Sequence, residues 1–159
     1  GALAQRGWST EILVVDDEPE YRLVLKNVLM TEGYHVILAE NGEDAYKKLT
    51  ENKVDLVISD IYMPVLDGIR FHRMVRANSQ YAQLPFLFVS AYDDQHTLEA
   101  VKDARYEGFL RKARPVAEMK EWIHYLMTPE DKRPKLPPGG ARSRRETGRS
   151  KPDRLAADR

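Results

Sequence analysis

The stretch SDIYMPVLDG, residues 59–68, follows the apolar run VDLVI (54–58) and raises the question of what its first aspartate does. Asp60 ends that run, and a carboxylate at the end of a buried strand costs free energy unless another group shares its charge or uses it. Asp67 and Gly68 close the turn that follows. The pattern therefore predicts a buried strand that carries an acidic group to a functional edge.

Four other apolar runs accompany this one along the chain. They are ILVV (12–15), HVILA (35–39), PFLFVS (85–90) and GFL (108–110). Most are rich in valine, isoleucine or phenylalanine and are too short for helices, so they are predicted to be strands. Segments with helical spacing lie between them, and five alternations of strand and helix predict an α/β fold with a parallel sheet covered on both faces.

Each predicted helix has its own start or stop signal. The first opens at Pro19 and stops at Gly33, and Asn41 caps a second that runs through Leu49. The third follows Asp67 and Gly68, the fourth begins at Asp93 or Asp94, and the fifth starts at Pro115. The apolar residues expected on their faces are Val24, Leu25, Val28 and Leu29; Ile69, Phe71, Met74 and Val75; Leu98 and Val101; and Val116, Met119, Ile123 and Leu126.

Four of the five runs have candidate functional residues at or just after their ends. In a parallel sheet covered by helices, ligands gather at the carboxyl ends of the strands. The residues expected at this rim are Asp16, Asp17 and Glu18 after the first strand, Asp60 after the third, Ser90 after the fourth and Lys112 after the fifth. Four acids, a hydroxyl and an ammonium group are therefore expected to meet at one edge.

This set of groups suits phosphoryl transfer. Carboxylates brought close together repel unless a cation shares them, and Mg²⁺ takes a few carboxylates, a carbonyl and waters. One carboxylate can then attack phosphorus and form an aspartyl phosphate. Lys112 and Ser90 could donate hydrogen bonds to its oxygens. The chain has no cysteine, which excludes disulfides and thiolate chemistry, and it has no glycine-rich phosphate loop.

These motifs together resemble the receiver domain of bacterial two-component response regulators. The matching features are ILVVDDEP, the strand-ending Asp60 with MPxxDG after it, VSA around Ser90, and FLRK ending at Lys112. The resemblance covers roughly residues 10–128. It implies a flavodoxin-like, doubly wound (βα)5 fold with a five-stranded parallel sheet in the order 2-1-3-4-5.

The resemblance also implies a role for each matched residue. Asp60 would be the phosphoacceptor and Lys112 the phosphate-binding lysine. Ser90 would be the switch hydroxyl and Phe109 the switch aromatic, so that phosphorylation changes the face formed by the fourth helix, fifth strand and fifth helix. The Mg²⁺ ligands would be Asp16, Asp17, Asp60 and the backbone carbonyl of Tyr62.

Three features depart from the usual receiver pattern. Lys112 is followed by Ala113-Arg114-Pro115 rather than directly by proline, so the start of the fifth helix is expected to differ. Arg105 stands where receivers often have glycine, which implies a strained residue or a different end to the fourth helix. Tyr62 and Tyr92 stand where the family admits water to the phosphoryl group, and their bulk predicts slow autodephosphorylation.

Charge divides the chain into parts. Residues 129–159 hold ten lysines and arginines against five acids and five of the nine prolines, whereas residues 1–128 carry fifteen against twenty. A segment of this composition cannot bury enough apolar surface to offset its ordering entropy. The expected organisation is a leader or tag remnant at 1–9, a receiver domain at 10–128, and a disordered, basic, proline-rich tail or linker at 129–159. The tail leaves no room for an effector domain, so the chain is expected to be a stand-alone regulator or a fragment of a larger protein.

The leading functional hypothesis is a cytoplasmic signalling module of a two-component phosphorelay, not an enzyme in its output. Its partners would be a sensor histidine kinase or phosphotransfer protein and an output protein, or a second copy in a homodimer. Three alternatives stay open: a pseudo-receiver that acts as a constitutive interaction domain, a Mg²⁺-dependent phosphatase, and a nucleic-acid binder working through the tail. For the RSRR run (142–145), a solvated linker is favoured over nucleic-acid contact. No apolar window is long enough to span a membrane.

Overall fold

The strands form one five-stranded parallel sheet. The computed structural model describes residues 10–139, so the leader at 1–9 and the predicted tail from 140 on lie outside the described residues. The strands are β1 (Glu11–Val15), β2 (His35–Ala39), β3 (Leu56–Asp60), β4 (Phe86–Ser90) and β5 (Glu107–Arg111). Their order is β2-β1-β3-β4-β5, which confirms the predicted sheet topology.

Four α-helices and three short 3-10 turns connect or follow these strands in residues 10–139. The helices are α2 (Pro19–Thr31), α3 (Gly42–Glu51), α4 (Gly68–Ala77) and α5 (Val116–Met127). The turns are η1 (Ser79–Tyr81), η2 (Thr97–Ala100) and η3 (Glu130–Lys132). None of these helices is long and apolar enough to cross a membrane.

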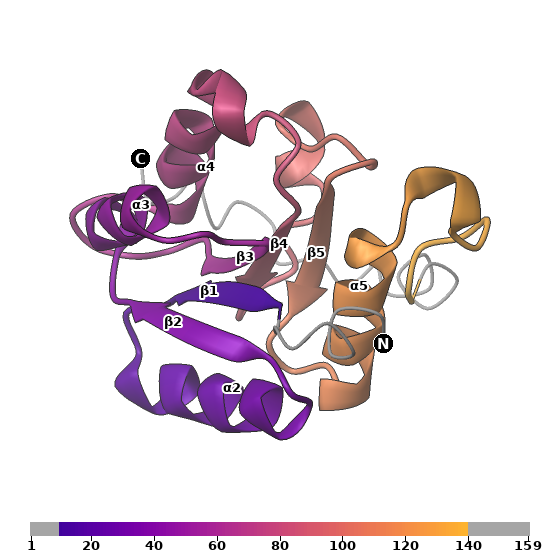
Figure 1. Cartoon of the computed structure of the whole chain (residues 1–159), viewed down its shortest axis with the longest axis horizontal. Helices are drawn as coiled ribbons and strands as arrows, with labels where there is room; N and C mark the ends of the chain where they lie inside the picture. The colour runs from indigo at the N-terminus through magenta and orange to yellow at the C-terminus, as the bar shows by residue number, and fades with distance from the viewer. Residues whose placement is uncertain (1–9, 140–159) are drawn as a thin grey trace. The chain divides into compact units, whose positions relative to one another are not determined.

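The chain divides into two compact units, one ending at Phe86 and the other beginning at Leu87. In the first unit, β1 pairs in parallel with both β2 and β3. Ile12, Val14 and Ile58 are fully buried in these strands. Figure 1 shows α2 on one side of β1 and β2, with α3 and α4 on the other. A strand that is covered on both faces has apolar side chains at successive positions, which explains the apolar runs in the sequence.

The helices of the first unit begin where the sequence predicts, although α3 runs two residues beyond the predicted Leu49. Pro19 lies in the first turn of α2, and Gly33 follows its end with φ +90°, a conformation that glycine adopts without strain. The side chain of Asn41 accepts a hydrogen bond from the Asp44 amide at 2.8 Å, and Asp67 accepts one from Arg70 at 2.8 Å. Such caps satisfy amide groups that the first helical turn leaves without partners.

The predicted apolar faces are partly wrong. In α2, Leu25 and Leu29 are buried, but Val24 is 52% exposed. Met74 and Val116 are also exposed, at 40% and 42%. Val24 and Met74 each lie about one residue step, roughly 100°, away from the buried stripe of their helices, because 3.6 residues make one turn. Val116 lies in line with the buried Met119 and Ile123, but it is the first residue of α5.

In the second unit, α5 packs on β5 through an aromatic contact. A β-carbon at Gly108 would lie 2.4 Å from the Trp122 ring, so only glycine leaves room for this side chain. Trp122 is buried, and its ring meets that of Tyr125 edge to face at 5.7 Å. Both aromatic residues of α5 therefore belong to the packing of this unit.

The predicted fourth helix is wrong. Between β4 and β5 the described chain has only the 3-10 turn η2, not an α-helix starting at Asp93 or Asp94. Leu98 is fully buried, but Val101 is only half-buried. One apolar anchor does not supply the amphipathic face from which a short helix draws most of its stability. The aspartates, histidine and threonine at its start also have low helix propensity.

Side chains then end this segment in an irregular turn. The carboxylate of Glu107 accepts a hydrogen bond from the Asp103 amide, and Asp103 accepts one from the Arg105 amide at 2.9 Å. In residues 10–139 the only non-glycine residue with positive φ is Val65, so Arg105 is not in a left-handed conformation. Of the two expectations for Arg105, the different chain geometry is the one observed.

Residues 129–139, the start of the predicted tail, contact α5 and the turn before β5 within the second unit. The guanidinium of Arg133 donates hydrogen bonds to the backbone carbonyls of Thr128 at 2.9 Å, Arg105 at 2.7 Å and Leu126 at 3.3 Å. It also stacks 4.9 Å from the centre of the Tyr125 ring. We call residues 129–139 the strap. Its arginine satisfies carbonyl groups at the end of α5 that have no partner within the helix.

Replacing Arg133 by alanine is expected to destabilise the chain by about 1–2 kcal/mol, because several charge-assisted hydrogen bonds to carbonyls are lost. Urea unfolding followed by circular dichroism measures the change. Lys132→Ala, one residue earlier at an exposed position of η3, is the matched control and should be nearly neutral. Equal stability of the two variants would contradict a structural role for the strap.

Candidate phosphoacceptor site

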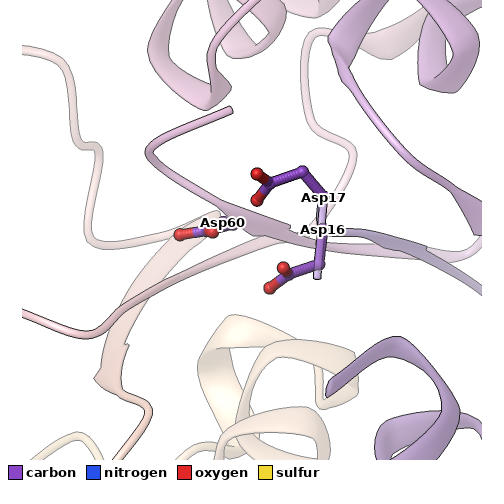
Figure 2. A group of neighbouring side chains, drawn as sticks. All are labelled: Asp16, Asp17 and Asp60. Carbon is purple, nitrogen blue, oxygen red and sulfur yellow. The ribbon is translucent and has the colours of Figure 1, made fainter. Parts of the chain in front are cut away.

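Three aspartates gather at the carboxyl ends of β1 and β3. Asp16 and Asp17 follow the last residue of β1, and Asp60 is the last residue of β3. One carboxylate oxygen from each of the three lies within 4.8 Å of the other two. Asp16 is fully buried and Asp60 is 5% exposed, whereas Asp17 is exposed. Figure 2 shows the three side chains projecting from these two neighbouring strand ends.

The backbone of the next two residues holds the Asp60 carboxylate. One of its oxygens accepts a hydrogen bond from the Ile61 amide at 2.8 Å and a long one from the Tyr62 amide at 3.4 Å. Hydrogen bonds to the charged form of a carboxylate favour that form. The acid is therefore fixed in position by the chain that follows it.

Asp16 is held by the start of α2. Its carboxylate accepts a hydrogen bond from the Glu18 amide at 2.9 Å, and its backbone carbonyl accepts one from the Arg22 guanidinium. The N-terminus of a helix carries partial positive charge, which favours a nearby carboxylate. In the motif DDEP, the Asp16 carboxylate and the start of α2 therefore stabilise each other.

The turn after Asp60 depends on Gly68. The Gly68 amide donates a hydrogen bond to the Ile61 carbonyl at 2.9 Å, and a β-carbon on Gly68 would lie 2.0 Å from the Asp60 carbonyl oxygen. No side chain fits in that space, because the obstacle is backbone. Gly68 thereby lets α4 begin directly beside the end of β3, which explains the glycine in the turn.

Val65, in the same turn, is backbone-strained. It is 71% exposed and has φ +71°, a region that β-branched residues rarely adopt. The left-handed conformation costs an L-residue roughly 1–2 kcal/mol. Burial of Val65 does not offset this cost, so the strain must be balanced by the contacts that fix the turn on either side.

The remaining predicted site residues belong to the second unit. Ser90 is the last residue of β4 and is fully buried, and Lys112 follows β5 and donates its amide to the Ser90 carbonyl at 2.7 Å. Phe109 lies in β5 and is 8% exposed. Ser90 and Lys112 therefore lie next to each other at the carboxyl ends of β4 and β5.

The chain enters α5 after Lys112 without a cis peptide bond, and residues 10–139 contain no cis peptide bond. Pro115 precedes the first residue of α5, and the Arg114 amide donates to the Arg111 carbonyl at 3.0 Å. The Arg114 guanidinium pairs at 3.1 Å with Glu118, which lies in the first turn of the helix. The altered sequence therefore makes its own helix start.

One polar contact was not anticipated from the sequence. The Ser90 hydroxyl donates a hydrogen bond to the carboxylate of Asp94 at 2.6 Å, and Asp94 is only 2% exposed. The sequence places an acid four residues after the serine, but spacing in an irregular segment does not show that the two meet.

Known proteins resemble the chain over this same region. The family described as "Response regulator receiver domain" matches residues 12–124. The chain belongs to the response regulator receiver family. The matched region contains every aspartate of the acidic cluster, together with Ser90 and Lys112.

Curated relatives are response regulators of greater length. The chain is 40% identical over 85 residues to the alkaline phosphatase synthesis transcriptional regulatory protein PhoP of Bacillus subtilis, covering 54% of this chain and 35% of that protein. It is 33% identical over 123 residues to the response regulator MprA of Mycolicibacterium vanbaalenii, covering 76% of this chain and 52% of that protein. The chain thus spans between a third and about half of the length of these relatives.

Solved structures share the fold. The chemotaxis protein CheY4 of Vibrio cholerae has a TM-score of 0.69 at 28% identity, covering 75% of this chain and 99% of that chain. The response regulator TrrA of Thermotoga maritima, solved in complex with Mg²⁺ and beryllofluoride, has a TM-score of 0.64 at 35% identity, covering 74% and 98%. The flavodoxin-like fold class is confirmed.

Gly68→Ala is expected to destabilise the chain by about 3 kcal/mol, because its methyl group would overlap the Asp60 carbonyl oxygen and force the turn apart. Chemical denaturation measures this loss. Gly33→Asn is the control, since Gly33 has no atom within 4 Å of an added β-carbon and asparagine tolerates positive φ. A Gly68→Ala variant as stable as that control would contradict the close approach.

Proposed function

We propose that this receiver domain accepts a phosphoryl group on Asp60 and acts as a phosphorylation-controlled signalling module. The observation that carries the proposal is the cluster of Asp16, Asp17 and Asp60 at two strand ends, in a chain of the receiver family. Asp60 is the member of the cluster that is both nearly buried and fixed by two backbone amides.

The acidic cluster fits Mg²⁺. Oxygens that share one octahedral Mg²⁺ lie roughly 2.9–4.2 Å apart, given metal–oxygen distances near 2.1 Å. The observed spacing, within 4.8 Å, needs only a small side-chain movement to meet this requirement. Asp16, Asp17 and Asp60 would hold the ion together with the Tyr62 carbonyl. When bound, Mg²⁺ would offset the negative charge shared by the acceptor and the incoming phosphoryl group.

Asp60, Lys112 and Ser90 would then have separate roles in the reaction. An Asp60 carboxylate oxygen forms a bond to phosphorus while the bond between phosphorus and the donor breaks. By family resemblance, Lys112 and Ser90 donate hydrogen bonds to the phosphoryl oxygens. Phosphorylation adds about −1.5 to −2 charges at neutral pH, a change large enough to redirect both donors.

The output would be a change of surface rather than turnover of a substrate. We propose that Ser90 moves toward the phosphoryl group and that Phe109 follows it, which alters the surface of η2, β5 and α5. In this chain that surface lacks the expected fourth helix and carries the strap, held by Arg133. Family membership supports a histidine kinase or phosphotransfer protein as donor in the cytoplasm. An output protein or a second copy of the chain would read the surface.

Incubation with Mg²⁺ and a small acyl-phosphate donor is expected to add one phosphoryl group to the wild-type chain and none to Asp60→Asn, because the amide cannot act as the nucleophile. Intact-mass spectrometry measures the addition. Asp93→Asn, a non-cluster aspartate in the second unit, is the control and should be phosphorylated normally.

Two results would count against this proposal. Phosphorylation of Asp60→Asn to the wild-type extent would place the acceptor elsewhere. If wild type gained no phosphoryl group and beryllofluoride with Mg²⁺ left its NMR spectrum unchanged, the pseudo-receiver alternative, an interaction domain that works without phosphorylation, would replace it.

Tyr62→Asn is expected to lose its phosphoryl group severalfold faster than wild type. Tyr62 lies two residues after the acceptor and is half-exposed, so its ring can obstruct the attack of water on phosphorus. The decay of phosphorylated protein with time, followed by intact mass, gives the rate. Tyr46→Asn, a change of the same chemistry on α3, is the control. Equal decay of the Tyr62→Asn and wild-type proteins would show that the ring does not limit access.

A further inference from the structure

We propose that Asp94 is a positioning residue that holds the Ser90 hydroxyl and competes for it with the phosphoryl group on Asp60. The inference rests on the proposed function of Ser90 as a donor to that group. It adds a residue that the receiver motifs do not include, and it assigns a role to a nearly buried carboxylate of the second unit.

The contact between the side chains of Ser90 and Asp94 is short and is shielded from solvent. The Ser90 hydroxyl lies 2.6 Å from an Asp94 carboxylate oxygen, with Ser90 fully buried and Asp94 2% exposed. A hydrogen bond from a hydroxyl to a carboxylate is charge-assisted, and it is stronger away from water than at the surface. The bond therefore fixes the orientation of the hydroxyl in the described state.

The serine has only one proton to give. A hydroxyl group donates one hydrogen bond and accepts up to two. In the described state the proton is directed to Asp94, while the oxygen accepts a hydrogen bond from the Tyr92 amide at 3.1 Å. Donation to a phosphoryl oxygen therefore requires Ser90 to leave Asp94, and the two acceptors compete for the same proton.

Asp94 also connects this exchange to the chain that follows. Its backbone carbonyl accepts a hydrogen bond from the Leu98 amide at 3.1 Å, and the Leu98 side chain is fully buried in η2. Loss of a charge-assisted hydrogen bond in a nearly buried position raises the free energy of the carboxylate and favours a change in its position. Movement of Asp94 would therefore pull on the η2 segment, and loss of the Ser90 bond is coupled to a change there.

The test is a titration with beryllofluoride, a phosphoryl mimic, at saturating Mg²⁺. The amide NMR signals of Ser90 and Tyr92 report binding. Asp94→Asn is expected to bind beryllofluoride about tenfold more tightly than wild type, because a neutral amide oxygen holds the hydroxyl less strongly than a carboxylate. Asp93→Asn removes the same charge one residue earlier, outside this contact, and is expected to bind as wild type does.

A double-mutant cycle separates positioning from general structure. In a Ser90→Ala background there is no hydroxyl to hold, so adding Asp94→Asn should leave the beryllofluoride affinity unchanged. An equal gain from Asp94→Asn with and without the serine would overturn the inference. So would an Asp94→Asn affinity equal to or weaker than that of wild type.

A measurement on the wild-type chain covers the case in which Asp94→Asn does not fold. The ¹³C signal of the Asp94 carboxylate should shift on addition of Mg²⁺ and beryllofluoride, since the carboxylate loses its hydroxyl donor. Binding with no such shift would overturn this inference and leave the proposed function in place. Absence of binding to wild type and to every variant would overturn both.

Discussion

The placement of the Asp60 carboxylate is the constraint on which the first unit depends. The acid is 5% exposed at the end of a buried strand, and its charge is met by the amides of Ile61 and Tyr62. These amides can point back at the acid only because the chain turns immediately, and the turn closes only because Gly68 has no side chain to strike the Asp60 carbonyl. A single steric requirement thus links the position of Asp60, the turn and the start of α4.

The irregular segments of the second unit are held by a few buried side chains and by hydrogen bonds between side chains and backbone. Trp122 fills the space above Gly108, and Leu98 anchors the short turn η2. Between and beyond these anchors the path of the chain is set by Asp103, Glu107 and Arg133. Segments held in this way open more easily than packed helices. This property would favour the change of surface that we propose to follow phosphorylation.

Under the proposed function, the Ser90 hydroxyl would have two acceptors for its one proton: the Asp94 carboxylate, which it contacts in the structure, and a phosphoryl group on Asp60. Such a hydroxyl would be a two-state element, and a ligand that favours one acceptor would shift its population. Burial increases the free-energy difference between the two states, because water is not available to donate a hydrogen bond to the acceptor that the hydroxyl has left. The acid at 94 would therefore help to set how strongly a phosphoryl group must act before the surface responds.

Much of the fold and the acidic cluster could be predicted from sequence. The alternation of short apolar runs with helical segments determined the parallel sheet, since strands buried on both faces must be continuously apolar. The cluster followed from the same argument, because parallel strands bring the residues after them to one edge, where Asp16, Asp17 and Asp60 lie within reach of one another. Helix caps such as Asn41 and Asp67 were also predictable, because they act over three residues.

Only the tertiary structure decided the rest. It replaced the predicted fourth helix by η2, because among the described side chains of that segment Leu98 is the one fully buried apolar side chain. It exposed Val24, which apolar character alone had placed on the buried face of α2. It also brought the Asp94 carboxylate to the Ser90 hydroxyl and laid Arg133 across the end of α5. Periodicity and capping are local properties, so they can be recognised in the sequence. The contacts of Asp94 and Arg133 depend instead on the path of the irregular segments. That path depends on hydrogen bonds to backbone groups that are distant in the sequence.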